Sequence, residues 1–130
     1  MRFMILVKGT ADSEAGAMPD QRIFEAMADY HQQLQEAGVL LDASGLQPSA
    51  KGWRIRYSGG KRTTVDGPFT ETKELIAGYT LIEVRSRDAA LDWARRFPTP
   101  TGADGEIEVR PLYELDDLGP GEAVRRFRDI

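Results

Sequence analysis

The chain has 130 residues, and its 17 Lys and Arg against 21 Asp and Glu give a formal net charge of −4. It has no cysteine and a single histidine, which excludes a disulfide framework, a thiolate nucleophile, and metal sites built on cysteine or on several histidines of one chain. The charges are evenly mixed and give no overall basic surface for nucleic acid, while the length suits one domain with its own core.

A short strand and a long helix are predicted in the first third of the chain. The apolar run of residues 3–7 contains β-branched side chains and indicates a strand buried on both faces, and therefore a central one. Apolar residues spaced by four and three positions from Ile23 to Ala37 form one helical stripe. Gly38 suits the C-terminal cap of this helix, and Pro19 and Asp20 suit its first turn.

Residues 39–46 return to strand character and lead into a loop rich in Gly, Pro and Ser. Residues 53–57 alternate apolar side chains with arginines, and residues 62–65 form the returning strand of a hairpin. The two glycines between them, Gly59 and Gly60, supply the positive φ angles of a tight turn.

The second half of the chain predicts a core strand, a helix and an alternating strand. Residues 76–85 are long and apolar enough for a core strand, in which Gly78 marks a bulge or a close approach of backbone. Ser86 is a suitable N-cap for a helix over residues 87–97. Residues 106–110 alternate, and the proline that follows puts this strand near an edge or a strand end.

The order strand, helix, strand, hairpin, strand, helix, strand predicts an α+β fold, the ferredoxin-like split β-α-β arrangement with an inserted hairpin. We assign residues 1–115 to one domain and residues 116–130 to a polar C-terminal tail with a short helix. Two helices cover one face of a four-stranded sheet, and a large apolar sheet face in water is unfavourable. We therefore expect a homodimer in which a second copy covers the other face.

One stretch is far more specific than the rest of the sequence. Residues 66–74 spell DGPFTETKE and are followed by IAGY at residues 76–79. With three supporting segments, this stretch resembles the DGPF-motif branch of the YCII-related (YciI-like) family over about residues 2–113. The supporting segments are AGVLL at 37–41, GLQPS at 45–49 and IEVRP at 107–111.

The resemblance implies a dimeric α/β barrel in which two sheets pack face to face, in agreement with the homodimer expected from the sheet. It also implies a cytosolic protein whose biochemical role is unsettled. Members of the DGPF-motif branch are often associated with extracytoplasmic-function sigma factors, so the resemblance implies a sigma factor as a partner. Relatives elsewhere in the family have been proposed as small-molecule enzymes.

Asp66 begins the motif at the end of the returning strand, and two roles are open for it. In the structural role, its carboxylate accepts hydrogen bonds from the following backbone N–H groups and fixes the turn. In the functional role, Asp66 is an acid or base whose pKa is raised by desolvation, and Lys73 orients an anionic substrate. The side chains expected around the ligand in this role are Glu71, Glu74, Phe69, Tyr79 and Arg110.

His31 lies about 80° from the centre of the helical stripe, at its flank. In the YciI-like branch a histidine on the first helix has been proposed to form an active-site pair with an aspartate. Here Met27 stands where that histidine is expected, so a catalytic pair of His31 with Asp66 competes with a boundary histidine that has an apolar body and a wet tip. The catalytic alternative predicts that His31→Ala abolishes turnover and leaves the melting temperature nearly unchanged.

The hairpin is expected to carry a basic patch on one surface, with Trp53 and Tyr57 on the other. The basic side chains are Lys51, Arg54, Arg56, Lys61 and Arg62. Such charges protect an edge hairpin against strand addition, and we favour this role over an anion or nucleic-acid site.

These observations favour a small-molecule-binding or regulatory homodimer, because the chain has no evident nucleophile, metal site or cofactor loop. The first alternative is a cofactor-independent enzyme that uses Asp66 as acid or base, with His31 or Lys73 assisting. The second is a purely structural dimer. The motif carboxylates match no metal-ligand spacing, so we expect neither metal nor cofactor, and no direct nucleic-acid partner. The apolar run at the start is too short for a signal peptide or a membrane span, which predicts a cytoplasmic protein without a membrane partner.

Overall fold

The computed structural model describes residues 1–100 and 104–130, and these contain a four-stranded antiparallel sheet and a two-stranded hairpin. The sheet strands are β1 (Arg2–Lys8), β2 (Leu40–Gly45), β5 (Ile76–Glu83) and β6 (Ile107–Pro111). The hairpin strands are β3 (Trp53–Ser58) and β4 (Lys61–Asp66). The α-helices are α1 (Ala11–Glu14), α2 (Gln21–Glu36), α3 (Arg87–Arg95) and α4 (Glu122–Arg126).

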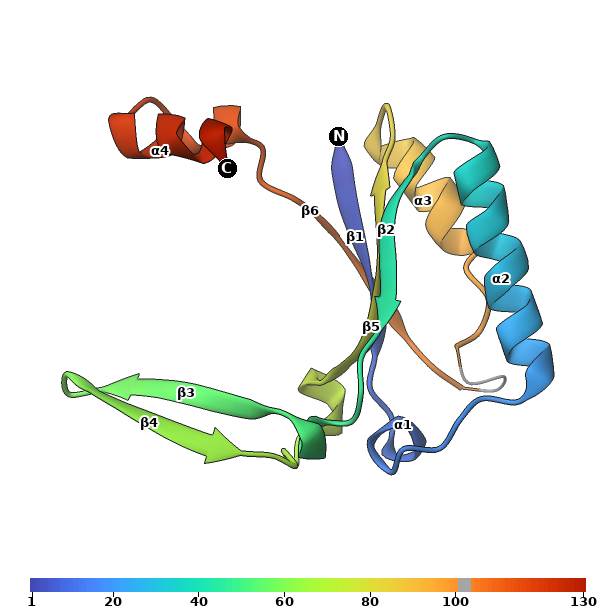
Figure 1. The fold of residues 1–130 in the computed structure, drawn as a ribbon. Helices are drawn as coiled ribbons and strands as arrows, with labels where there is room; N and C mark the ends of the chain where they lie inside the picture. The colour runs from blue at the N-terminus through green and yellow to red at the C-terminus, as the bar shows by residue number, and fades with distance from the viewer. Residues whose placement is uncertain (101–103) are drawn as a thin grey trace.

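The sheet order β2-β5-β1-β6 is the split β-α-β order expected from the sequence. In the chain, the hairpin is inserted between β2 and β5, which are neighbours in the sheet. Figure 1 shows α2 and α3 together on one face of the sheet, with the opposite face uncovered. The α+β class and the one-sided layer of helices are thus confirmed. We call the uncovered surface the open face.

The core lies between the sheet and the two long helices, because alternate side chains of each strand point there. Its buried members are Phe3, Ile5, Tyr30, Leu34, Ile82, Val84 and Ala90. The Tyr30 hydroxyl donates a 2.7 Å hydrogen bond to the Trp93 carbonyl, which ties α2 to α3, and burial raises the pKa of Tyr30 to about 12. Met4 and Leu6 of β1 are only half-buried on the open face, so the prediction that this strand is buried on both faces is wrong for the single chain.

Helix α2 begins at Gln21, after the two residues that were predicted to lie in its first turn. Asp20 is its N-cap and accepts a hydrogen bond from the Ile23 amide at 3.1 Å, so Pro19 precedes the helix and does not lie in its first turn. Gly38 has a φ of +73° just beyond the helix, as its predicted capping role requires. Ser86 caps α3 as predicted, accepting from the Ala89 amide at 3.1 Å.

Gly78 fills both roles that the sequence suggests for it. The register of β1 against β5 shifts between Val7 and Lys8, directly beside Gly78. A Cβ atom at Gly78 would lie 3.1 Å from the Ser44 carbonyl oxygen, tighter than most side chains tolerate. The glycine therefore lets β2 pass close to β5 at this bulge.

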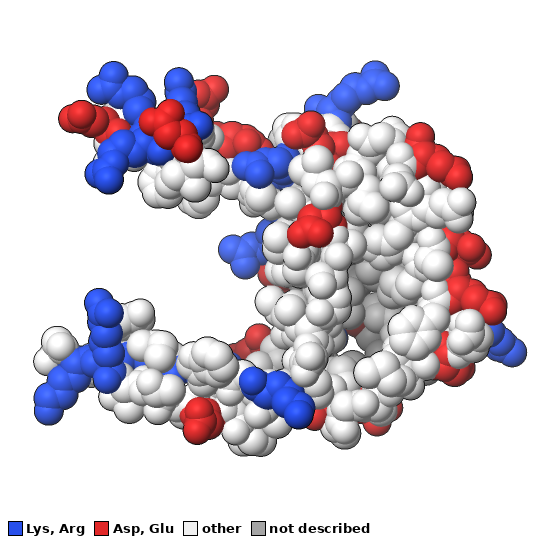
Figure 2. Space-filling model, in the orientation of Figure 1, with Lys and Arg blue, Asp and Glu red and all other residues white. Residues whose placement is uncertain are grey.

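Two arms leave the sheet on its open side. The hairpin arm is residues 51–66 and the C-terminal arm is residues 113–130, which includes α4 near the predicted short helix. In Figure 2 the arms stand apart, and the space between them lies in front of the open face. The chain exposes 9793 Å², whereas a compact monomer of its mass exposes about 6,900 Å². The single chain therefore has a large excess of surface.

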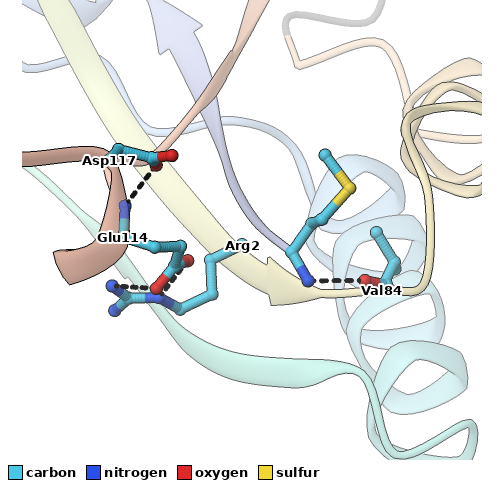
Figure 3. Close-up of polar contacts among 5 residues, drawn as sticks. Arg2, Val84, Glu114 and Asp117 are labelled. Carbon is cyan, nitrogen blue, oxygen red and sulfur yellow. Dashed lines mark hydrogen bonds and ion pairs between the residues drawn. The ribbon is translucent and has the colours of Figure 1, made fainter.

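An ion pair fixes the C-terminal arm to the sheet (Figure 3). Two nitrogens of Arg2 donate to the two carboxylate oxygens of Glu114 at 3.0 and 3.1 Å, and the Glu114 amide donates to Asp117 at 2.8 Å. The hydrogen bonds from Arg2 hold the pKa of Glu114 below its usual value of 4.5, and the same contact raises the pKa of Arg2. The start of the C-terminal arm is thus held at the N-terminal end of β1.

We expect Glu114→Gln to loosen this arm, because an amide replaces the charged partner of Arg2. Limited trypsin digestion should cleave the variant several-fold faster after Arg125, Arg126 or Arg128 than it cleaves the parent chain. Asp129→Asn is the matched control, because it removes a carboxylate of the same arm that has no ion pair among the described residues. Equal cleavage of Glu114→Gln and its parent would contradict the anchoring role.

The same ion pair should respond to pH. Because the pKa of Glu114 is lowered by folding, its contribution is complete above about pH 4.5 and is lost as the pH falls through the lower folded value. Fluorescence anisotropy of a dye on Phe127→Cys should therefore fall on acidification, and the Glu114→Gln background should flatten this change.

Candidate functional site

The DGPF motif forms the root of the hairpin arm. Asp66 ends β4 opposite Trp53, and the Gly67–Pro68 peptide that follows is cis. The Gly67 amide donates to the Gly52 carbonyl at 3.0 Å. A Cβ atom at Gly67 would lie 1.9 Å from the Ser49 carbonyl oxygen, a distance that no side chain can adopt without moving the backbone. Glycine is therefore required where the two strands of the arm rejoin the domain.

Ser49 connects this root to α1, the short helix after β1. Its hydroxyl accepts a 3.0 Å hydrogen bond from the Phe69 amide, and its own amide donates to the Glu14 carboxylate at 2.8 Å. The same hydroxyl donates to Glu14. The Arg54 guanidinium stacks 3.7 Å from the centre of the Phe69 ring. These contacts hold the two ends of the hairpin arm in one fixed direction.

The charged residues of the motif stand apart from this network. Asp66, Glu71, Lys73 and Glu74 are all exposed, and among the described residues no side-chain hydrogen bond or ion pair joins one of them to another. The structure therefore brings Gly67 and Phe69 together with Ser49, and it leaves the four charged side chains in solvent in the single chain.

The close packing at the root predicts different effects of alanine at Gly67 and at Gly52 on stability. We expect Gly67→Ala to destabilise the protein by about 1–3 kcal/mol or more, because its Cβ must displace the Ser49 backbone. Gly52→Ala is the control from the same root, since its Cβ would lie an ordinary 3.7 Å from the same carbonyl oxygen. Thermal unfolding followed by circular dichroism should separate the two variants, and equal melting temperatures would refute the proposed close approach.

His31 joins α2 to the covered face of the sheet. One ring nitrogen, Nδ1, lies 2.7 Å from the Met27 carbonyl oxygen, and the other, Nε2, lies 2.8 Å from the Thr80 hydroxyl. A carbonyl oxygen can only accept, so the proton of the neutral ring lies on Nδ1, and Nε2 then accepts from Thr80. Thr80 is 2% exposed, which makes His31 the partner of a buried hydroxyl.

This geometry separates His31 from the motif. Its ring contacts β5 on the helix side of the sheet, whereas Asp66 lies at the root of an arm on the open side (Figure 1). Both ring nitrogens already have partners within the fold. In the single chain, His31 is half-buried as a boundary histidine should be, but the tip of its ring bonds the buried Thr80 hydroxyl, so the prediction of a wet tip is wrong.

We expect His31→Ala to lower the melting temperature, in contrast to the catalytic alternative. Loss of the ring leaves the Thr80 hydroxyl buried without a partner, which costs about 1–3 kcal/mol, or roughly 3–10 °C for a domain of this size. The double variant His31→Ala/Thr80→Val has no unsatisfied hydroxyl. Its loss of unfolding free energy should therefore be smaller than the sum of the losses in the two single variants. Additive losses in this double-mutant cycle would show that the hydrogen bond contributes nothing.

The open face carries paired polar groups among apolar ones. The Tyr79 hydroxyl donates to Asp42 at 2.8 Å, and this hydrogen bond raises the pKa of Tyr79. Glu108 lies 3.5 Å from both Lys8 and Arg110. The half-buried apolar side chains of the same face are Met4, Leu6 and Leu81.

Sequence reasoning selected Tyr79 and Arg110 of this face but missed Asp42, Lys8 and Glu108. Strand parity could have found Lys8 and Glu108, because they stand two positions from Leu6 and Arg110. Asp42 carried no such signal, because the register of β2 against β5 shifts just before it.

The hairpin register changes the predicted distribution of its arginines. Residues directly opposite each other in a ladder share a face, and Arg62 is opposite Tyr57, with its guanidinium 5.3 Å from the ring centre. Arg62 therefore lies on the aromatic face with Trp53, and the prediction that it shares a surface with Arg54 and Arg56 is wrong. Arg56 and Arg62 are six positions apart. Within one strand an even separation keeps two side chains on the same face, but across this two-residue turn it puts them on opposite faces.

The described residues contain two hollows, both away from the DGPF motif. These hollows, of about 390 and 380 Å³, lie in the C-terminal arm and at the hairpin tip, and neither is lined by Asp66, Glu71 or His31. No cluster of three metal-ligating side chains occurs in the described part of the chain. None of its helices combines the length and apolarity that a membrane crossing needs.

Comparison with known proteins identifies the family of this domain. A family model of the YCII-related domain matches residues 1–116. The chain belongs to the YCII-related family. The match covers the sheet, both long helices and the hairpin arm, and it ends within the C-terminal arm.

Two relatives extend this result. An uncharacterised protein of Rhizobium meliloti strain 1021 is 38% identical over 93 residues, which cover 72% of this YCII-related chain and 75% of that protein. The solved structure of 5-chloro-2-hydroxyhydroquinone dehydrochlorinase from Burkholderia phenoliruptrix AC1100, in complex with 2,5-dihydroxybenzoquinone, is similar with a TM-score of 0.50 and 14% identity. That alignment covers 87% of this chain and 94% of the dehydrochlorinase, and it shows a shared fold.

Proposed function

We propose that this YCII-related chain works as a homodimer that binds a small molecule between two open faces. The observation that carries the proposal is the pairing of polar side chains on an otherwise apolar, uncovered sheet face: Tyr79 with Asp42, and Glu108 with Lys8 and Arg110. A surface that only held two copies together would be served by apolar side chains. Polar groups already matched in hydrogen bonds can be enclosed at small cost and then presented to a ligand.

The excess surface supports the homodimer. Roughly 2,900 Å² above the expectation for a compact monomer is of the order that one partner of a stable obligate dimer buries. The two-fold symmetry of such a dimer would place the apolar side chains of one open face against those of the other. The barrel of two facing sheets that the DGPF motif implies is one such arrangement.

The polar groups suggest a hydroxylated or acidic small molecule. Tyr79 presents a hydroxyl and Asp42 an acceptor, while Lys8 and Arg110 are cations able to pair with an anionic group. The dehydrochlorinase of similar fold was solved with a hydroxylated quinone, which makes that compound a reasonable first probe. Of the ligand-binding residues expected from the sequence, Tyr79 and Arg110 belong to this proposal.

The enzyme alternative remains a second proposal, favoured by the enzymatic activity named for the structural neighbour. In it, the exposed Asp66 acts as acid or base once a second copy encloses it, with Lys73 or His31 assisting and Glu71, Glu74 and Phe69 around the ligand. A cytoplasmic location and association with a sigma factor are further proposals, and they rest on the resemblance of the DGPF motif.

The experiment combines solution mass with titration of 2,5-dihydroxybenzoquinone. We expect the parent chain to sediment as a dimer and to bind the probe, and Tyr79→Phe to bind it about tenfold more weakly because one hydrogen bond is lost. Leu81→Lys should give a folded monomer that does not bind. Leu91→Lys is the control for a leucine-to-lysine change elsewhere, since Leu91 is 43% exposed on α3, away from the open face.

Two results would contradict the proposal. One is a parent chain that sediments as a monomer at micromolar concentration. The other is a folded, monomeric Leu81→Lys that binds the probe as tightly as its parent, because the site would then not require two facing sheets.

A further inference from the structure

The hairpin arm lacks any cover of its own in the single chain. All six side chains of β3 are exposed, and in β4 Val65 alone is half-buried. A two-stranded hairpin is at best marginally stable in water unless it packs against another surface. The fixed root described above orients the arm and covers only its base, where Phe69 stacks on Arg54. The rest of the arm needs a further surface.

The two faces of the hairpin arm differ in kind. Trp53, Ile55 and Tyr57 share one face and are 65%, 41% and 72% exposed. Arg54, Arg56 and Lys61 occupy the other. Arg62 and Asp66 also lie on the first face, opposite Tyr57 and Trp53, so that face is mainly aromatic and the other mainly basic. Such a strand pair is suited to bury the first face and to leave the second in water. The aromatic face is therefore the one that needs an occupant.

The length of the arm shows how far that occupant lies from the sheet. Six residues per strand extend about 20 Å, whereas two packed sheets lie only about 10 Å apart. In a dimer with facing open faces, an arm that leaves on the open side continues past the interface (Figure 1). It then lies alongside the second copy.

The charges of the two arms indicate which part of the second copy it meets. Residues 51–66 contain five cations and one acid, 5 − 1 = +4, and Figure 2 shows Lys and Arg gathered along this arm. Residues 113–130 contain five acids and three arginines, 3 − 5 = −2. Three of those acids fall between Glu114 and Asp117, where the side chain of Asp116 is 95% exposed.

The C-terminal arm also offers matching apolar side chains. Tyr113, Leu118 and Phe127 are 77%, 44% and 58% exposed. The arm leaves the sheet at the end opposite the hairpin arm (Figure 1). A two-fold axis that runs across the strands brings each hairpin arm to the partner's C-terminal arm, whereas an axis along the strands would bring two arms of +4 together.

We infer that, in the homodimer, each hairpin arm lies along the C-terminal arm of the second copy and buries Trp53 and Tyr57 there. This inference rests on the proposed homodimer and adds to it the orientation of the two copies. It also means that the space between the open faces is closed at both ends by an arm from each copy. The ligand site of one chain is then incomplete without the other.

The absence of cysteine allows a direct test, because introduced cysteines react alone. Ser58→Cys marks the tip of the hairpin arm and Asp116→Cys marks the C-terminal arm, and each variant carries a different affinity tag. We expect a short bismaleimide to cross-link a mixed dimer of the two variants efficiently, and to cross-link Ser58→Cys homodimers at least tenfold less. Asp88→Cys, on the helix-covered side, is the control for random collision.

Trp53 supplies a second readout that does not depend on a cross-linker. In a Trp93→Phe background it is the sole tryptophan, because the chain has two. We expect acrylamide to quench its fluorescence several-fold less in the dimer than in the Leu81→Lys monomer.

The possible failures are distinguishable. A dimer in which Ser58→Cys cross-links to itself, or in which Trp53 is as open to acrylamide as in the monomer, overturns the arm exchange and leaves the homodimer standing. A parent chain with the mass of a single copy overturns the proposed function, and the arm exchange with it.

Discussion

The fold depends on a sheet with two apolar faces and helices for only one of them. On the covered face, α2 and α3 bury Phe3, Ile5 and Ile82 in a continuous core. On the open face, Met4, Leu6 and Leu81 remain half in water. The hydrophobic effect favours removing that surface, and no further element among residues 1–100 and 104–130 covers it. The proposed homodimer, its ligand site and the inferred placement of the arms are all argued from this imbalance.

The DGPF motif has a structural role in the same architecture, because it forms the root of the hairpin arm. In the proposed homodimer the hairpin reaches the second copy and needs a stiff root. Gly67 packed on the Ser49 carbonyl, with Phe69 bonded to the Ser49 hydroxyl, provides one. Glu14 ties that root to α1, the short helix after β1. This structural role belongs to Gly67 and Phe69. The Asp66 carboxylate does not fix the turn as predicted, because the Gly67 amide donates to the Gly52 carbonyl and the Phe69 amide to the Ser49 hydroxyl.

Much of the fold could be predicted because its signals are local. Strand alternation, the helical stripe from Ile23 and the caps at Gly38 and Ser86 depend on neighbours within a few residues. The contacts of the candidate site are not local: Glu14 meets Ser49 across 35 positions, and Tyr79 meets Asp42 across 37. A register shift in β2 and the side on which Arg62 emerges are set by strand pairing, which no single-strand pattern encodes.

The central claim is that the open face is covered by a second copy of this chain. Small-angle X-ray scattering of the unmodified protein tests it most directly, because the forward scattering gives the mass and the radius of gyration gives the compactness. We expect a mass of two chains that stays constant down to low micromolar concentration, in a particle more compact than two chains side by side. A mass of one chain, with the extended profile of free arms, would contradict the account.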